Sequence, residues 1–181
     1  MSAWRSRIQA WRADPRAQLV GFLLRLGLFL WGLTTLVTRL DEGIRQPVRA
    51  ATAWVNYAIL SVFTAKVSWR GELVTLDGFA VHIIDECVGW LEMVIFISAV
   101  LAFATSWRNR ALGVVLGIVG IYFFNIVRIL VLVIVGRYAH DLFDFTHVYF
   151  WQATLIILIT GLWVLWIRFV VRDEAGPVVR T

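Results

Sequence analysis

Residues 111–135 read ALGVVLGIVGIYFFNIVRILVLVIV and contain a single charged side chain, that of Arg128. At 1.5 Å per residue, a helix of this length is about 38 Å long, which exceeds the roughly 30 Å hydrocarbon core of a bilayer. Uninterrupted apolar runs of this length are typical of membrane-spanning helices. The stretch therefore predicts an integral membrane protein built from α-helices.

The rest of the chain supports this class. Of its 181 residues, 60% are hydrophobic, whereas soluble domains average nearer to half. Apolar runs over 18–38, 87–105 and 147–171 predict three further spans. Residues 50–65 are also apolar, but a helix over them would be only about 24 Å long, so we expect an interfacial or re-entrant helix there. If these residues span the membrane instead, every later segment lies on the opposite side of the membrane from the one expected here.

A β-hairpin is predicted between the interfacial helix and the second span. Residues 67–84, VSWRGELVTLDGFAVHII, alternate β-branched and polar residues around Gly71 and Asp77-Gly78, which are turn signals. Because unpaired strand edges are not tolerated in lipid, this hairpin must lie outside the bilayer. The predicted fold is thus an all-α integral membrane domain over 1–181, with about four transmembrane helices, an interfacial helix and a short extracytoplasmic β-hairpin.

Basic residues set the expected orientation. Four spans place the basic segment 1–17, the loop SWRNR (106–110) and the tail 172–181 on one side, which with Arg168 at the end of the last span carries nine basic residues against six on the other. Positive charge near spans marks the cytoplasmic face, so we expect both termini in the cytoplasm and a location in the cytoplasmic (inner) membrane. The net charge of +5 does not indicate nucleic-acid binding, because the arginines flank apolar segments and form no stripe with aromatic residues.

Cys87 is the only cysteine, which excludes an internal disulfide and any CxxC pair. It opens the predicted 87–105 helix, where the positive end of the helix dipole stabilises a thiolate. Gly89 leaves the first turn uncrowded, so that a peptide could approach. Asp85 and Glu86 oppose a thiolate, bind a substrate cation or cap the helix, and the sequence leaves these roles open. The ordinary alternative for Cys87 is a small buried apolar side chain.

Arg128 lies 17 residues into the 111–135 helix, about 26 Å from its inner end and so in the outer third of the membrane. A charge at this depth costs a few kcal/mol unless it faces a partner or water, which makes it a functional candidate. Asn125 lies one turn earlier on the same face and favours an inward polar surface. The alternative is an arginine that reaches the outer headgroups.

Three histidines, His82, His140 and His147, fall on the outer side of the predicted topology. Histidine carries protons at neutral pH, and His147 stands at a helix start, where a rigid element would position it well. Cysteine, histidine and arginine together suit acyl transfer, with Cys87 as nucleophile and Arg128 as the stabiliser of a developing oxyanion.

Other chemistries find little support. Asp141 and Asp144 lie between His140 and His147, but no H-x-x-x-H or HExxH pattern accompanies them, so no metal site is predicted. The chain has no phosphate-binding loop and no dinucleotide fingerprint, so no cofactor is expected.

Three short motifs resemble the exosortase/archaeosortase family of membrane transpeptidases, and most of all its small exosortase H-like members. They are ECVGWLEMVIFISAVLAF (86–103), NIVRI (125–129) and FTHVYFWQ (145–152). That family has a cysteine in a C-[ST]-G-like motif, an N-x-x-R-[IV] motif in a later helix and a histidine heading the next one. The resemblance covers about residues 70–165. Val88 departs from it, since the family usually has a small polar residue there.

The resemblance implies a sorting enzyme whose site faces the extracytoplasmic side. Its substrates would be secreted proteins that end in a short motif, a hydrophobic helix and a basic tail. Cleavage would leave an acyl-enzyme on Cys87, which an amine on a membrane lipid or envelope component would resolve. The implied catalytic residues are Cys87, Arg128 and His147, with supporting or substrate-binding roles for Asn125, Gly89, Asp85 and Glu86. A protease that only hydrolyses its substrate and a non-catalytic membrane scaffold for secreted proteins are the alternatives.

Overall fold

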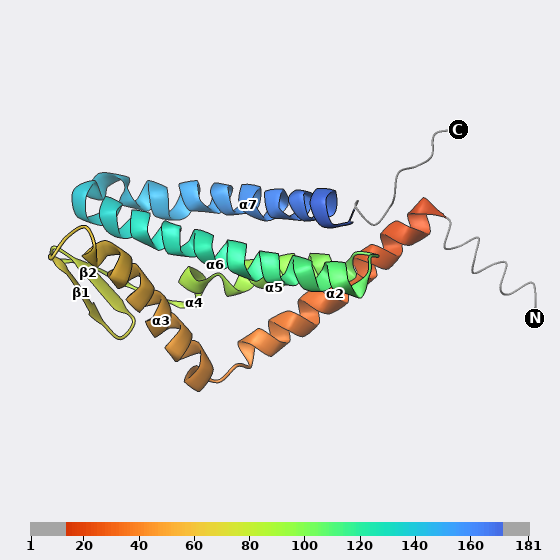
Figure 1. The fold of residues 1–181 in the computed structure, drawn as a ribbon, viewed down its shortest axis with the longest axis horizontal. Coiled ribbons are helices and arrows are strands. Elements are labelled where there is room, and N and C mark those ends of the chain that lie inside the picture. The colour runs from red at the N-terminus through yellow and green to blue at the C-terminus, as the bar shows by residue number, and fades with distance from the viewer. Residues whose placement is uncertain (1–13, 172–181) are drawn as a thin grey trace, which may run out of the picture.

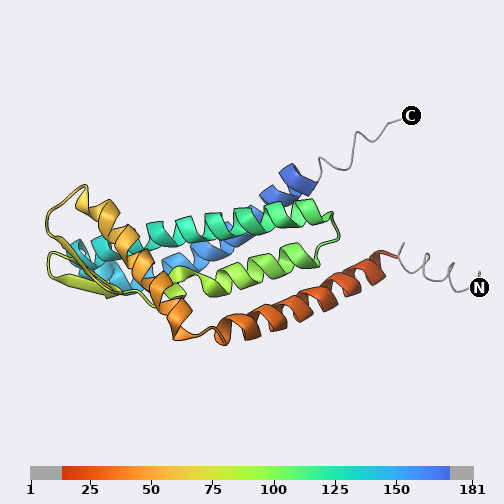
Figure 2. The ribbon, with the colours of Figure 1, turned by 60° about the horizontal axis from the view of Figure 1, so that its bottom comes forward.

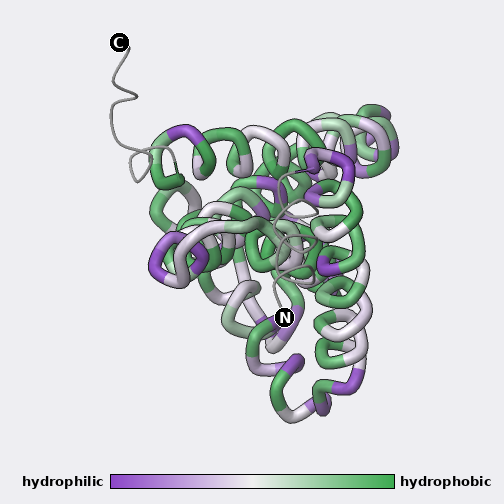
Figure 3. The backbone as a smooth tube through the Cα atoms, turned by 90° about the vertical axis from the view of Figure 1, so that its right-hand side faces the viewer, coloured by the Kyte–Doolittle hydropathy of each residue, from purple (hydrophilic) through white to green (hydrophobic). Residues whose placement is uncertain are grey.

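Four apolar helices form the body of the structure, a computed structural model that describes residues 14–171. They are α2 (Pro15–Thr38), α5 (Trp90–Ala102), α6 (Trp107–Tyr138) and α7 (Trp151–Trp166). Figure 2 shows α5 running between α2 and α6, and α7 packs along α6. Viewed from the end where α2 begins and α7 ends, apolar residues predominate along the helices (Figure 3). The expectation of a mostly helical membrane protein is confirmed, with 79% of the described residues in helices.

Three helices of the described part are long and apolar enough to cross a membrane: α2, α6 and the helical stretch over 140–171. The helix α5 has only 13 residues, or about 20 Å, because Gly89 interrupts it at one end and it stops at Ala102. The predicted 87–105 helix was therefore too long, and three of the four expected spans are supported.

The ends of α2 and α6 are set by capping residues. Helix α2 starts three residues before the predicted 18–38, because the Asp14 carboxylate accepts a hydrogen bond from the Arg16 N–H and Pro15 fits the first helical position. Helix α6 starts at Trp107, since the Ser106 hydroxyl accepts from the Asn109 N–H. It continues to Tyr138, so its 32 residues extend beyond the predicted span at both ends.

The region predicted as one hairpin is a three-stranded antiparallel sheet in the order β1 (Val67–Arg70), β2 (Leu73–Leu76) and β3 (Phe79–His82). Both turn signals make a turn. Gly71 has φ 59°, and Asp77 and Gly78 have φ 47° and 92°, the left-handed values that a tight two-residue hairpin turn requires. The single-hairpin prediction was wrong because it used these signals for one turn in place of two.

The predicted 50–65 helix is the second half of α3 (Glu42–Ser61), which begins earlier, in a charged segment. It packs against β1, β2 and α6, and it is not among the helices that qualify as spans. Between the sheet and α5, the chain forms α4 (Asp85–Val88), a single helical turn.

The segment that joins α6 to α7 is more helical than predicted. The segment between the predicted 111–135 and 147–171 spans holds the end of α6 and the short 3-10 turn η1 (His140–Leu142). The last helix begins with the π-helical turn η2 (Phe145–Phe150) and ends with the π-helical turn η3 (Ile167–Val171), so it covers the predicted 147–171.

An apolar cluster joins the sheet, α3, α4 and the second half of α6. Its buried members are Ala53, Leu60, Val74, Leu76, Ile83, Cys87, Ile129 and Val133. Further along α6, Gly136 lies against the Phe79 ring, and the Arg137 guanidinium bonds the Asp77 carboxylate at 2.7 Å. The sheet and α3 therefore sit at the end of the molecule where α6 turns into α7 (Figure 1).

The start of α2 and the end of α7 lie at the same end of the molecule, opposite the sheet (Figure 1). That both flanks share one side of the membrane stays a prediction. Most of the predicted basic segment 1–17 lies outside the described residues. Its last three residues, Pro15–Ala17, belong to α2. The predicted tail, 172–181, lies entirely outside the described residues.

Candidate active site

Cys87 lies in the one-turn helix α4, where its backbone N–H donates to the Ile84 carbonyl at 2.9 Å. The next helix, α5, starts only after Gly89, which has φ 88° and breaks the helical path. The prediction that Cys87 opens a long helix is therefore wrong. The dipole of α5 begins after the cysteine, so it provides no helix-start stabilisation of the thiolate of the kind expected.

The Cys87 side chain is 7% exposed and belongs to the apolar cluster, with Ile129 and Val133 of α6. This burial raises the pKa of the Cys87 thiol, and a hydrogen bond between the thiol and the Ile84 backbone and the positive charge of Arg128 offset the rise only in part. The resting cysteine is thus a neutral thiol, and a base is needed to activate it.

Gly89 and Asn125 bring α4 and α5 directly onto α6. A Cβ atom at Gly89 would collide with the Asn125 amide nitrogen, so only glycine fits this position. Asn125 is 1% exposed and its Nδ2 donates to the Ile121 carbonyl at 3.0 Å, while its buried Oδ1 has no hydrogen-bond partner among the described residues. A buried acceptor without a hydrogen-bond partner destabilises the folded protein, and such groups are often found at functional sites.

Arg128 follows Asn125 by one turn and is half-buried, with a buried Nε that has no hydrogen-bond partner within residues 14–171. Its guanidinium makes no ion pair there, yet it lies close enough to Cys87 to act on the thiol electrostatically. Arg128 is thus a cation without an ion-pair partner in the part of the chain that the structure describes, near the only cysteine of the chain. Such a cation can stabilise negative charge that develops near Cys87.

His147 lies at the same level of the α6–α7 pair as Arg128. The Phe124 and Trp151 rings meet edge-to-face at 5.5 Å. Arg128 lies one turn after Phe124, and His147 lies one turn before Trp151. Because the two helices are antiparallel, both steps lead toward the same end of the helix pair. The imidazole is exposed and stacks on the Phe143 ring at 5.6 Å. No hydrogen bond joins it to Cys87 in the described part of the chain.

The model of the transmembrane exosortase family matches residues 15–166, and so most of the chain. The chain belongs to the transmembrane exosortase family. No curated protein and no solved structure matches it. The match includes every residue assigned above to the candidate site.

In this exosortase family member, the two carboxylates before Cys87 differ in their surroundings. Asp85 accepts hydrogen bonds from Arg45 and Arg49 of α3, both at 2.8 Å, and makes no helix-capping bond. Glu86 is exposed, and its charge opposes ionisation of the Cys87 thiol. Asp85 therefore anchors the cysteine turn to α3. Sequence reasoning missed Arg45 and Arg49, whose only signal was their four-residue spacing on one face of a helix.

The other two histidines lie away from Cys87. His82 pairs with Glu72 through Nε2 at 3.1 Å, and His140 packs edge-on against Phe79. Within residues 14–171, no group of three or more histidine, cysteine, aspartate and glutamate side chains is arranged to hold a metal ion.

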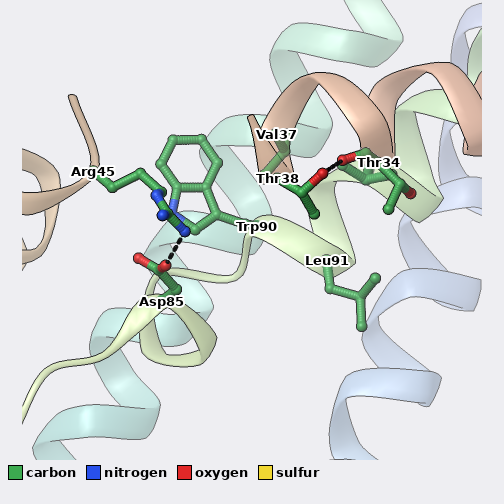
Figure 4. Close-up of a pocket in the computed structure, with 8 residues that line it drawn as sticks. Thr34, Val37, Thr38, Arg45, Asp85, Trp90 and Leu91 are labelled. Carbon is green, nitrogen blue, oxygen red and sulfur yellow. Dashed lines mark hydrogen bonds and ion pairs between the residues drawn. The ribbon is translucent and has the colours of Figure 1, made fainter. Parts of the chain in front are cut away.

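A pocket of about 170 Å³ opens beside the cysteine turn in this family member (Figure 4). The end of α2, Arg45 and the start of α5 enclose it, and its lining residues are Thr34, Val37, Thr38, Arg45, Asp85, Trp90, Leu91 and Val94. Figure 4 shows the Arg45 guanidinium bonded to Asp85 next to the Trp90 indole. Cys87 is not in its lining.

Proposed function

We propose that this chain is a cysteine transpeptidase of the cytoplasmic membrane that cleaves a C-terminal sorting signal from secreted proteins and transfers the product to an amine. The observation that carries the proposal is the position of Arg128. It is a half-buried cation without an ion-pair partner in the described residues, and it acts on the single thiol of the chain. Both residues lie inside the exosortase match.

Cys87 is the proposed nucleophile. Its sulfur would attack the carbonyl carbon of the scissile peptide bond, and the guanidinium of Arg128 would stabilise the negative charge that develops on the carbonyl oxygen. Because burial raises the pKa of the thiol, a general base must remove its proton.

His147 is the proposed base. It would take the thiol proton and return it to the leaving amine as the carbon–nitrogen bond breaks, which leaves a thioester on Cys87. An acceptor amine would then attack the thioester, regenerate the thiol and release the joined product. The exposed imidazole has to approach the sulfur when substrate binds, and catalytic hydrogen bonds commonly tighten only in that complex.

The proposed partners follow from the family and from the basic flanks. We expect secreted proteins that carry a motif, an apolar helix and a basic tail at their C-terminus, and an acceptor amine on a lipid or envelope component. The reaction would take place on the extracytoplasmic side, where the sheet and α3 surround the cysteine turn. Glu86 is exposed there and is a candidate for contact with substrate.

A variant tests the nucleophile. Cys87→Ala should abolish processing of a secreted protein from the same genome that ends in such a signal, while the variant still accumulates in the membrane. Ser98→Ala removes a buried hydroxyl from α5 and is the matched control. It should still process the substrate. Processing that continues in Cys87→Ala rejects the assignment.

Mass spectrometry of the new substrate C-terminus then distinguishes transfer from hydrolysis. An added amine-linked group supports the transpeptidase, whereas a free carboxylate identifies a protease that uses the same thioester. A scaffold would support export in Cys87→Ala as well as in the wild type.

A further inference from the structure

Arg49 of α3 binds three carboxylates from three parts of the chain. Its guanidinium contacts Glu72 at 2.8 Å, Asp85 at 2.8 Å and Glu42 at 2.7 Å. The Arg49 side chain is 13% exposed, that of Glu72 17% and that of Asp85 28%, whereas Glu42 is 60% exposed, so the pairs with Glu72 and Asp85 are the ones partly shielded from water. Such pairs are less screened by salt than pairs on an open surface. The three carboxylates raise the pKa of Arg49, and the bond to Asp85 is the largest cause.

The three partners of Arg49 lie in α3 itself, in the sheet and in α4, and of these Asp85 is also bound by Arg45 of α3 at 2.8 Å. Glu42 begins α3, Glu72 lies in the turn between β1 and β2, and Asp85 begins α4. A planar guanidinium has five donors in a fixed fork, which lets one arginine serve several acceptors at once. Arg49 thus ties the sheet and α4 to the same point on α3.

The turn that carries Cys87 needs such an anchor. Helix α4 has four residues and no side-chain cap, and one turn of helix is unstable on its own. Asp85 and Cys87 are two residues apart, so they point to nearly opposite sides of this turn. The Asp85 side is held by α3, and the Cys87 side packs against Ile129. Movement of one side of the turn therefore moves the other.

We propose that Arg49 is a positioning residue of the active site. By holding Asp85 and Glu72 together, it fixes the cysteine turn so that the sulfur of Cys87 stays under the influence of Arg128. This inference rests on the proposed function for its catalytic meaning, but the position of the sulfur can be measured without any substrate.

The test is a double-mutant cycle on the chemical reactivity of Cys87 in the full-length protein, purified in lipid nanodiscs. The readout is the second-order rate of alkylation by iodoacetamide, a small neutral reagent that reacts with the thiolate. In an otherwise wild-type protein, Arg128→Met should slow alkylation, because the cation that favours the thiolate is lost. In an Arg49→Gln background, Arg128→Met should have little further effect.

Arg137→Gln is the matched control. It removes another arginine–carboxylate pair of the same sheet, that with Asp77, but leaves the cysteine turn untouched. In this background, Arg128→Met should slow alkylation as much as it does in the wild type. A role of Arg49 in stability alone would leave the Arg128 effect unchanged, so additive effects in the Arg49→Gln background overturn the proposal. Equal loss of the Arg128 effect in the Arg49→Gln and Arg137→Gln backgrounds also overturns the proposal.

Two further variants keep the test decisive. Asp85→Asn retains the bonds from Arg49 to Glu42 and Glu72, so it serves where Arg49→Gln does not accumulate, and it should also remove the Arg128 effect. Arg49→Lys keeps the charge but not the fork, and it should rescue folding without restoring the Arg128 effect. Restoration by lysine contradicts the geometric role.

The outcome for processing separates this inference from the proposed function. If the enzyme is a cysteine transpeptidase, Arg49→Gln should lower kcat by up to about 100-fold, the size of effect that a displacement of about 1 Å produces in an active site, with a smaller change in KM. If Cys87→Ala still processes substrate, the proposed function fails while the alkylation cycle still reports on Arg49.

Discussion

Gly89 and Asn125 are in direct contact, and any side chain at position 89 would occupy the space of the asparagine amide. This contact joins the break between α4 and α5 to the helix that carries Arg128. It also fixes the backbone of Gly89 in the left-handed region, at φ 88°.

Gly89→Ala should destabilise the protein by about 1–2 kcal/mol from the left-handed backbone alone, and by more because the asparagine must move. Thermal unfolding in detergent and processing of the substrate should both decline. Gly161→Ala is the control, since a Cβ there meets no atom within 4 Å and alanine favours helix. Equal melting temperatures of Gly89→Ala and the wild type would contradict the packing described here.

Alkylation of Cys87 should still be increasing with pH at pH 9. Burial raises the pKa of the thiol above its ordinary value of 9.0, and only the thiolate reacts, so the rate follows the small ionised fraction. Alkylation rates measured from pH 6 to pH 10.5 test this expectation. A plateau below pH 8 would mean that the resting cysteine is a thiolate.

The sheet should lose stability in acid. The Arg49 guanidinium lowers the pKa of Glu72 below 4.5, and the Arg137 guanidinium lowers the pKa of Asp77 below 3.8. Carboxylates with lowered pKa values contribute their full stability above the unfolded value, and this contribution is lost as pH falls through the folded value. Amide hydrogen exchange of β2 and β3 should therefore change little from pH 7 to pH 5, after correction for the intrinsic rate, and lose protection below about pH 4.

Asp77→Asn is the companion variant for that measurement. It removes the carboxylate that Arg137 binds, so part of the acid-dependent loss of protection should disappear while β1 and β2 stay paired. An unchanged acid profile in Asp77→Asn would show that this pair does not contribute.

Arg128→Lys should retain only part of the processing activity, and Arg128→Met should lose about 100-fold or more in kcat, the typical cost of removing one oxyanion donor. Lysine keeps the charge but has no planar fork of donors. Turnover of the processing reaction, compared at equal membrane levels of each variant, gives the measurement. Wild-type turnover in Arg128→Met would exclude the oxyanion role.

The sequence contained enough to identify the long helices, because uninterrupted apolar runs such as the one inside α6 have few other outcomes. The break at Gly89 was not predicted. A lone glycine in an apolar run is compatible with a continuous helix, and what decides otherwise is contact with Asn125, 36 residues away. The third strand was missed because the two turn signals, at Gly71 and at Asp77-Gly78, were assigned to one turn, although each makes its own turn between four-residue strands.

The candidate site was predictable in its residue types and less so in its arrangement. Arg128 influences the Cys87 thiol, although Cys87 does not open a long helix as predicted. The sequence did not predict which arginines bind Asp85, because Arg49 and Asp85 are separated by 36 residues and only the folded chain brings them together. The exposed imidazole of His147 and its contact with Phe143 were also not predicted.

The length of α6 has a consequence for how the protein sits in lipid. About 20 residues cross a hydrocarbon core of about 30 Å, so the 32 residues of α6 leave about 18 Å of helix beyond it, in the headgroup region and in water. Its last turns carry the sheet through Gly136 and Arg137. A bilayer with longer acyl chains would cover more of this projecting part, so we expect the hydration of the surroundings of Cys87 to depend on membrane thickness.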